Sequence, residues 1–339
     1  MNTADSERIA ASLEMAGYRE TAVVEEADII VINSCVVRQA AEDSVYGFGK
    51  RAIVLKEKSP DLKIIVTGCL VGTLEERPQR IALDKLRKKI SWVDEFWPIG
   101  KIGFDMKPKR MEERSALIPI SSGCNNFCTY CVVPYTRGRE RSRAFREIIE
   151  ETKKVAENGA TEITLLGQNV NSYGKDLKPG HTFSELLIEL HAIDGITRIK
   201  FLTAHPKDMS DELIDTIASL PKIDRYLHFP IQAGDDEILR RMNRGYTVAD
   251  YVTLVGKIRA RIPRVEIGTD IIVGFPGETE EQFNHTKEVM EKVRFNNAFI
   301  AMYSPRKGSA AYALTDDVPR KEKQRRHHLL LETLHSFKS

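Results

Sequence analysis

The chain has 339 residues, of which 42% are hydrophobic and 29% are charged, and this ordinary globular composition excludes bulk disorder. Its 51 Lys and Arg residues nearly balance its 49 Asp and Glu residues, so the formal net charge is +2 and any nucleic-acid site must be a local patch. The length is sufficient for two domains.

The sequence gives no sign of a membrane segment or of secretion. Its longest apolar runs, such as Ile64–Val71 and Ala298–Tyr303, are far shorter than the roughly 18 residues that span a bilayer. The first residues lack the basic-then-apolar pattern of a secretory signal, so we expect a cytoplasmic protein. Because disulfides are rare there, the five cysteines are better explained by metal ligation or catalysis.

The first hundred residues alternate between helix and strand patterns. An amphipathic segment spans Ser6–Ala16, apolar strands span Asp28–Asn33 and Lys63–Thr67, and a helix begins at Gln39. This order predicts a small parallel α/β domain over residues 1–100.

The charged stretch 101–115 contains Pro108, shows no clean period and is the expected linker to a second domain at 116–339. In that domain strand and helix signals alternate six times, which predicts an open six-unit βα barrel rather than a closed eightfold one. The predicted strands lie near Ala116–Ser121, Glu162–Leu166, Arg198–Thr203, Arg225–Pro230, Val265–Val273 and Ala298–Ser304. The predicted helices are Arg146–Glu157, Phe183–His191, Asp211–Ser219, Tyr251–Arg261 and Glu280–Val293.

Two cysteines follow the N-terminal strands directly, Cys35 after Asn33-Ser34 and Cys69 after Thr67-Gly68. Ligand sites gather at the carboxyl ends of parallel strands, so both thiols are candidate ligands. The alternative is that both are buried structural cysteines.

The other three cysteines, Cys124, Cys128 and Cys131, lie within eight residues directly after the first barrel strand. Three thiolates on one loop can hold three irons of a 4Fe–4S cubane and leave the fourth iron open for chemistry. The alternatives are a zinc site or three unrelated buried cysteines, but zinc usually takes four ligands and the nearest histidine in the sequence is His181. The spacing matches the radical S-adenosylmethionine (SAM) superfamily, in which SAM binds the open iron.

Across nearly the whole chain the sequence resembles the methylthiotransferase family, and within it the MiaB-type tRNA 2-methylthioadenosine synthases. The blocks that carry the resemblance are Asn33–Arg38, Gly68-Cys69, Val133–Arg139, Leu165–Gly174 and Asp270–Thr279.

The resemblance implies that Cys35 and Cys69 are two of three cysteines that hold a second, auxiliary 4Fe–4S cluster. The family's first cysteine stands just before a segment that Met1-Asn2 and Asp5-Ser6-Glu7 match. We therefore expect that the natural start lies upstream or that the chain is a fragment, with two of the three auxiliary ligands as written. The family's C-terminal TRAM domain, which helps to bind RNA, is likewise expected to be absent.

By resemblance, the expected reaction transfers a methylthio group to C2 of N6-isopentenyladenosine next to the anticodon in tRNA, with two SAM molecules and two clusters. The expected partners are tRNA, an electron donor such as a flavodoxin or ferredoxin, and a sulfur donor. One alternative is a methylthiotransferase that acts on threonylcarbamoyladenosine or a ribosomal-protein aspartate. Another is a catalytically impaired fragment that serves only as an iron–sulfur or RNA-binding protein.

The resemblance also implies contacts to SAM. Tyr130 matches a position that lies against adenine, Gly167 and Gln168 match a motif that holds the SAM amino group, and Asp270 lies on an adenine-contacting strand. Tyr130 is equally explained by packing, and Asp270 by pairing with a neighbouring arginine. His205 and His228 also stand at strand ends, where lone histidines are more often structural.

A run of arginines follows the cysteine triplet. Arg137, Arg139 and Arg141, with Arg143 and Arg146 beyond them, are candidates for gripping RNA phosphates. The alternative is a solvated charged loop. The basic segment Arg320–His328 near the end of the sequence is open to the same two interpretations.

Overall fold

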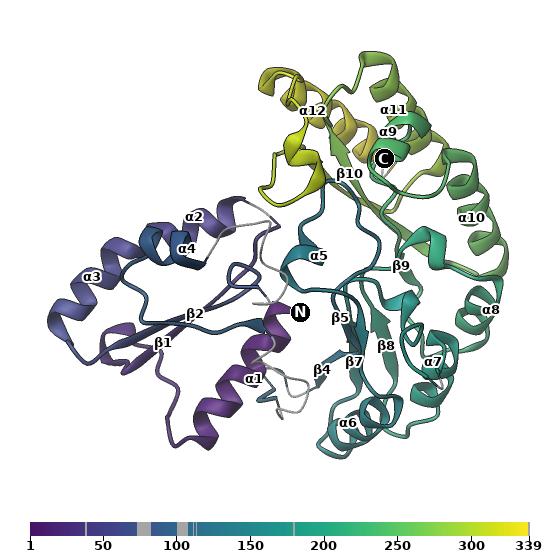
Figure 1. Cartoon of the computed structure of the whole chain (residues 1–339). Coiled ribbons are helices and arrows are strands. Elements are labelled where there is room, and N and C mark those ends of the chain that lie inside the picture. Colours follow the sequence, from purple (N-terminus) through teal and green to yellow (C-terminus); the bar gives the residue numbers. More distant parts are fainter. Residues whose placement is uncertain are drawn as a thin grey trace.

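The computed structural model describes residues 1–37, 39–72, 83–99, 108–110, 112, 114–178 and 180–337. In these residues a small three-stranded sheet with its helices lies beside a larger, curved array of strands that is wrapped by helices (Figure 1). The predicted α/β class, with a small parallel domain followed by an open barrel, is confirmed. Most of the expected linker lies outside the described residues.

The N-terminal sheet has the parallel order β1-β2-β3. Both predicted strands are confirmed to within one residue at each end. The strands are β1 (Ile29–Ser34), β2 (Lys63–Gly68) and β3 (Glu95–Phe96). The helices are α1 (Asn2–Met15), α2 (Gln39–Gly47), α3 (Gly49–Lys58) and α4 (Leu83–Lys89), with a 3-10 turn, η1, at Val24–Glu26.

The barrel strands of the described chain pair in parallel as two groups of three, β4-β7-β8 and β9-β10-β11. A single bridge from Ile199 to Ile223 continues from the first group toward the second. The strands are β4 (Ser115–Pro119), β7 (Glu162–Leu166), β8 (Arg198–Phe201), β9 (Tyr226–His228), β10 (Glu266–Val273) and β11 (Asn297–Met302). A short antiparallel pair, β5 (Ser121–Ser122) with β6 (Arg141–Ser142), lies above β4.

Helices cover the outer face of the barrel strands (Figure 1). Reciprocal capping boxes at Thr182, Thr247 and Thr279 begin α7, α10 and α11, which explains why these helices start where they do. The barrel helices are α5 (Val133–Thr136), α6 (Phe145–Glu157), α7 (Phe183–His191), α8 (Asp211–Ser219), α9 (Asp236–Arg241), α10 (Val248–Arg261), α11 (Glu280–Val293) and α12 (Arg320–Ser336). The 3-10 turns are η4 (Val170–Ser172), η5 (Pro206–Asp208) and η6 (Ala310–Ala313).

The main core lies between the barrel strands and their helices. Along β10, for example, Ile267, Ile271 and Val273 are buried in it. Since strand side chains alternate between faces, Asp270 points to the opposite, concave face. Polar groups at the carboxyl ends of these strands therefore converge on the mouth of the barrel.

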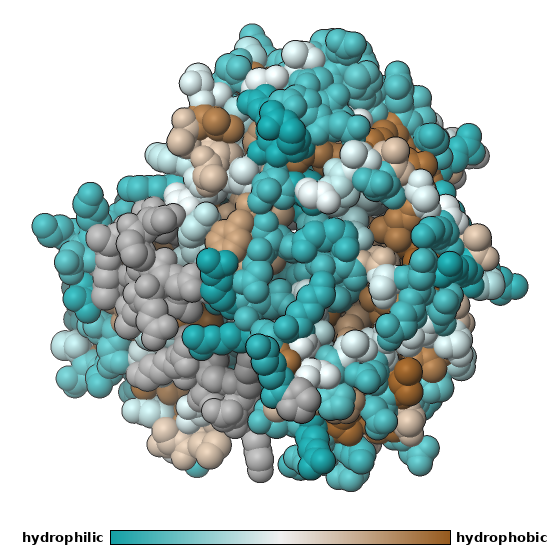
Figure 2. Space-filling view, turned by 45° about the vertical axis from the view of Figure 1, so that its right-hand side comes forward, coloured by the Kyte–Doolittle hydropathy of each residue, from teal (hydrophilic) through white to brown (hydrophobic). Residues whose placement is uncertain are grey.

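No helix in the described part of the chain is long and apolar enough to cross a membrane. The face of the molecule seen in Figure 2 is mostly hydrophilic, with apolar side chains in small separate groups.

Candidate functional site

The cysteine triplet lies on one loop that leaves the carboxyl end of β4 through β5. The loop turns at Gly123, whose φ is +81°, and a Cβ at that position would clash with the carbonyl oxygen of Arg139. The backbone N–H of Cys124 donates to the carbonyl of Gly138 at 3.2 Å. Close backbone approach therefore fixes the loop, and it explains the glycine before the first cysteine.

A second segment clasps this loop from the end of α9. The side-chain amide of Asn243 donates to the carbonyl oxygens of Asn126 and Phe127 at 3.2 and 3.1 Å. The hydroxyl of Thr129 donates to the carbonyl of Arg241 at 2.9 Å. These bonds join residues more than 100 positions apart, so the fold of the whole barrel holds the triplet.

One thiol of the triplet, that of Cys128, is buried, and those of Cys124 and Cys131 are half-buried. Cys128 is 8% exposed, burial raises the pKa of Cys124, and burial raises the pKa of Cys131 to about 12. The backbone N–H of Val133 lies 3.5 Å from the sulfur of Cys131. Thiols in such surroundings lose their protons only beside positive charge, which the irons of a cluster provide.

Arg244 supplies a positive charge at the same place. Arg244 is 4% exposed, and its guanidinium donates to the sulfur of Cys128 at 3.3 Å and to the hydroxyls of Tyr130 and Tyr246 at 3.3 and 2.8 Å. It also donates to the carbonyl of Pro230 at 2.7 Å. No Asp or Glu pairs with it in the described ranges. A buried cation needs an anion, and thiolates of a cluster fit that need.

The donor set therefore fits an iron–sulfur cluster. Within the described ranges, no three His, Cys, Asp or Glu side chains are arranged to hold a single metal ion. A cubane differs because each thiolate binds a different iron, so the three sulfurs need not converge on one point. Hydrogen bonds from N–H groups to the cysteine sulfurs help to set the reduction potential of such a cluster.

Cys35 and Cys69 directly follow two neighbouring strands of the N-terminal domain. They follow Ser34 and Gly68, which are register partners on β1 and β2. Gly68 has φ of +83°, so the turn into Cys69 requires glycine. The backbone N–H of Val37 lies 3.4 Å from the sulfur of Cys35, which gives this pair the same kind of donor as the triplet.

Arg137 completes the surroundings of Cys69. It is 6% exposed, and its Nε donates to the sulfur of Cys69 at 3.3 Å. Its Nη2 donates to a carboxylate oxygen of Asp5 at 2.6 Å and to the side-chain oxygen of Asn2 at 2.8 Å. The prediction that Arg137 grips RNA is therefore wrong, because the side chain is buried and its Nε and Nη2 donate hydrogen bonds inside the protein.

The two cysteine-bearing segments are connected across the domain boundary by residues close to each of them. Val132, which directly follows the triplet, is buried in the N-terminal core with Val36 and Cys69. On the other side, Arg306 of the loop after β11 is 7% exposed and pairs with Glu42 at 2.6 Å. It also donates to the carbonyl of Val36. Residues that follow the triplet and residues that follow β11 thus both contact the segments around Cys35 and Cys69.

The residues expected to contact SAM occupy the barrel mouth. The side-chain oxygen of Gln168 accepts from the backbone N–H of Gly123 at 2.6 Å, which ties β7 to the cysteine loop. A Cβ on Gly167 would lie 2.5 Å from the hydroxyl of Ser121. Asp270 lies 3.2 Å from the Nε2 of His228, so its partner is a histidine rather than the arginine considered from sequence.

Three further polar atoms in this mouth are buried without a hydrogen-bond partner among the described residues: the hydroxyl of Ser121, the side-chain oxygen of Asn169 and the Nε2 of His205. Burial lowers the pKa of His205 to about 3, so its imidazole is neutral. Unpaired buried polar groups at strand ends fit a place where a ligand or an ordered water supplies the missing bonds. Sequence inspection singled out His205 but not Ser121 or Asn169.

The remaining arginines divide by exposure. Arg139 and Arg141 are exposed, as RNA contacts must be. The guanidinium of Arg139 lies 4.3 Å from the ring centre of Phe127 in the cysteine loop. Arg143 is buried and paired with Glu151.

The basic segment near the end of the sequence also forms internal ion pairs. Arg326 is buried against Glu278 at 2.7 Å, and Arg325 bonds Glu322 at 2.6 Å. These pairs fit the interpretation of a solvated helix that packs on the barrel better than that of an RNA grip.

Two family models match the chain. The model described as the radical SAM superfamily matches residues 118–290, and the model described as uncharacterized protein family UPF0004 matches residues 1–87.

The chain is also similar to curated proteins along nearly its whole length. It is 44% identical to the tRNA-2-methylthio-N(6)-dimethylallyladenosine synthase of Acetivibrio thermocellus, with 98% of this chain and 74% of that protein covered. It is 42% identical to the synthase of the same name from Moorella thermoacetica, with 99% and 81% covered.

Among solved structures, the radical SAM methyltransferase TsrM from Kitasatospora setae matches with a TM-score of 0.57 at 15% identity, over 87% of this chain and 64% of that one. The cobalamin-dependent radical SAM enzyme OxsB matches with a TM-score of 0.53 at 11% identity, over 91% and 47%. At these identities the likeness shows the fold alone.

Proposed function

Since this chain belongs to the radical SAM superfamily and, within it, to the family of the tRNA-2-methylthio-N(6)-dimethylallyladenosine synthases, we propose that it transfers a methylthio group to C2 of N6-isopentenyladenosine next to the anticodon of tRNA. The reaction uses two SAM molecules and two 4Fe–4S clusters. Cys124, Cys128 and Cys131 hold one cluster, and Cys35 and Cys69 contribute to the other.

The observation that carries this proposal is the contact between Cys69 and the segment that follows the triplet. Methylthiolation needs a carbon to be activated and a sulfur group to be delivered to it, so the two sites must serve one substrate atom. Arg137 lies six residues after the triplet, and its Nε donates to the sulfur of Cys69 at 3.3 Å. Val132 of the same loop is buried with Cys69. A scaffold protein has no need for such a junction.

Cys124, Cys128 and Cys131 would hold the cluster, which would supply the electron for reductive cleavage of SAM. The protein's own residues position the cysteine loop and exclude water from it. Arg244 balances negative charge at Cys128 and orients its sulfur. Gln168 holds the loop against β7. Tyr130, Gly167, Gln168 and Asp270 are the proposed contacts to SAM.

The partners of this reaction are tRNA, a one-electron donor such as a flavodoxin or ferredoxin, and a sulfur donor. Exposed Arg139 and Arg141 are the proposed phosphate contacts beside the cysteine loop. Their position would let an anticodon loop lie over the junction of the two domains.

The test is nucleoside analysis of tRNA that carries isopentenyladenosine, after anaerobic incubation with the iron-loaded chain, SAM and a reductant. The expected product is the 2-methylthio nucleoside, and the Cys124→Ala, Cys128→Ala, Cys131→Ala triple variant should form none. Parallel reactions with threonylcarbamoylated tRNA and with a ribosomal-protein substrate test the two alternative acceptors. If SAM is cleaved but no acceptor gains sulfur, the proposed transfer is wrong.

A further inference from the structure

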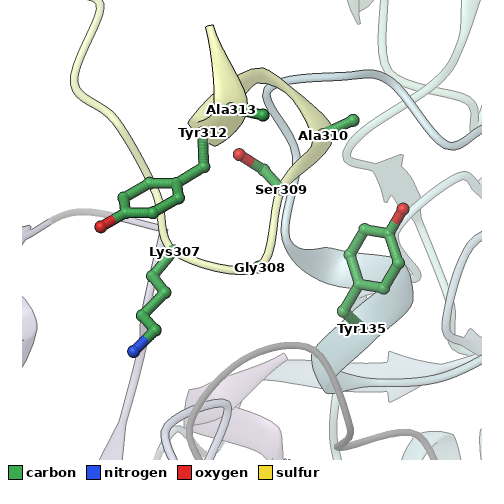
Figure 3. A pocket seen from close by; sticks show the side chains of 7 residues that line it. All are labelled: Tyr135, Lys307, Gly308, Ser309, Ala310, Tyr312 and Ala313. Atoms are coloured by element: carbon green, nitrogen blue, oxygen red, sulfur yellow. The ribbon is translucent and has the colours of Figure 1, made fainter.

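A pocket of about 380 Å³ opens between α5 and the loop that follows β11. This volume is within the roughly 300–1,000 Å³ range of ligand pockets. Tyr135 of α5 forms one wall, and residues 307–310, 312 and 313 of the loop form the other. In Figure 3, Tyr312 and Lys307 extend to the same side of the loop, while Tyr135 rises from α5 toward Ala310.

The loop that forms this pocket joins the two cysteine sites. The backbone N–H of Ala311 donates to the carbonyl of Thr129, inside the triplet, at 2.7 Å. Five residues earlier, Arg306 donates to the carbonyl of Val36, next to Cys35. The opposite wall is also close to both sites, because Tyr135 lies between Cys131 of the triplet and Arg137, which contacts Cys69. The pocket therefore opens at the junction of the two sites.

The walls of the pocket carry aromatic, small and positively charged groups. Tyr312 is 51% exposed, Lys307 is exposed, and no carboxylate is among the described lining residues. Gly308 and Ala310 leave space beside the rings. The ring of Tyr135 is held edge to face against Phe127, with 6.0 Å between ring centres.

We propose that this pocket holds an unpaired nucleotide of the RNA substrate, with its base stacked on Tyr312 and its phosphate beside Lys307. Proteins that read single-stranded RNA stack splayed bases on aromatic rings and neutralise phosphates with lysine or arginine. Because the pocket is open to water and radical chemistry needs a dry site, the nucleotide is a neighbour of the reacting adenosine, not that adenosine. The inference rests on the proposed function, for which it names an RNA subsite.

The experiment measures binding of an RNA hairpin with an anticodon stem and loop to the iron-loaded full chain by fluorescence anisotropy. Tyr312→Ala should weaken binding about 5- to 150-fold, the equivalent of losing one stacked base. Tyr312→Trp should bind like the parent because it keeps a ring. Lys307→Ala should lower the slope of log K against log salt by about 0.7, the loss of one phosphate contact to a single strand.

Matched controls are Tyr18→Ala, an exposed tyrosine of the N-terminal domain, and Lys153→Ala, an exposed lysine of α6. Both should bind the hairpin like the parent. If the parent binds the hairpin and methylthiolates tRNA while Tyr312→Ala binds equally well, the subsite is wrong and the proposed function stands. If the parent neither binds the hairpin nor modifies tRNA, both are wrong.

Discussion

The guanidinium of Arg137 contacts the sulfur of Cys69 across 68 positions of sequence, at 3.3 Å. Arg137 follows the last cysteine of the triplet by six residues, so one short segment is attached to both cysteine sites. Val132 of the same segment is also buried in one cluster with Cys69. The segment after the triplet is therefore part of the surroundings of Cys69.

The first prediction concerns the potential at the second site. N–H donors to cysteine sulfurs raise the reduction potential of an iron–sulfur cluster. Arg137→Gln, made in the Cys124→Ala, Cys128→Ala, Cys131→Ala background so that only the second cluster remains, should therefore lower that cluster's potential. A redox titration followed by electron paramagnetic resonance measures the shift, and an unchanged potential would remove Arg137 from this role.

The same substitution should also destabilise the fold. It leaves the buried carboxylate of Asp5, which is 7% exposed, without its cation, and breaking a buried pair costs about 3–5 kcal/mol. The double variant Arg137→Gln, Asp5→Asn should recover part of that loss. The midpoint of urea unfolding compares the three chains.

Arg244 is the subject of the second prediction. Arg244→Met keeps much of the side-chain length but removes the donor to Cys128 and the buried positive charge. Substitution of a residue that supports a metal ligand in this way typically lowers metal affinity or activity by about 10- to 100-fold. We therefore expect a loss of that size in SAM cleavage and a lower iron content. The control is Arg240→Met on the same segment, where the arginine is exposed and pairs with Glu237. Equal losses in both variants would contradict the argument.

Local patterns were enough to predict much of the fold. The strand Glu162–Leu166 and the helix Phe183–His191 have the predicted ends, because periodicity and the capping threonine are local signals. Both N-terminal cysteines stand at adjacent strand ends as expected. Short elements such as β3 and α9 were missed, since a few residues carry too little periodicity to be recognised.

The sequence was less informative about which charges are buried. Arg137 and Arg139 are two residues apart and look alike in sequence. Arg137 nevertheless donates hydrogen bonds to Asp5 and Cys69, while Arg139 is exposed. Arg244 gave no signal because its partner Cys128 is 116 positions away. Contacts of that range depend on how the barrel closes, which no local pattern encodes.

The third prediction is the iron content. If both cysteine sites hold clusters, the anaerobically loaded chain should contain about eight irons, and the Cys124→Ala, Cys128→Ala, Cys131→Ala variant about four. Iron and sulfide quantification with electron paramagnetic resonance gives both numbers. A parent with about four irons and a variant with none would mean that Cys35 and Cys69 alone do not retain a cluster. That result would contradict the proposed sulfur transfer.

The fourth prediction is a pH dependence of stability. Burial lowers the pKa of His205 to about 3 from an ordinary value of 6.5, so between these values the unfolded chain binds a proton that the folded chain does not. The contribution of this group to the free energy of unfolding is therefore full above pH 6.5 and falls as the pH falls toward 3. At about pH 5 the contribution is about 2 kcal/mol lower than at neutral pH. His205→Gln should remove that part of the dependence, as urea unfolding at about pH 7.5 and about pH 5 can show.

His285 provides a control of opposite sign. Its hydrogen bond to Asp235 at 2.9 Å raises the pKa of the imidazole. The folded chain therefore holds this proton more tightly, and the resulting stability is present at low pH and is lost as the pH rises through the folded-state pKa. Because the side chain is 43% exposed, solvent screening keeps the effect small. His285→Gln should thus slightly steepen the loss of stability toward acid pH, whereas His205→Gln should flatten it. Shifts of the same sign in both variants would contradict the assignment of a neutral, buried His205.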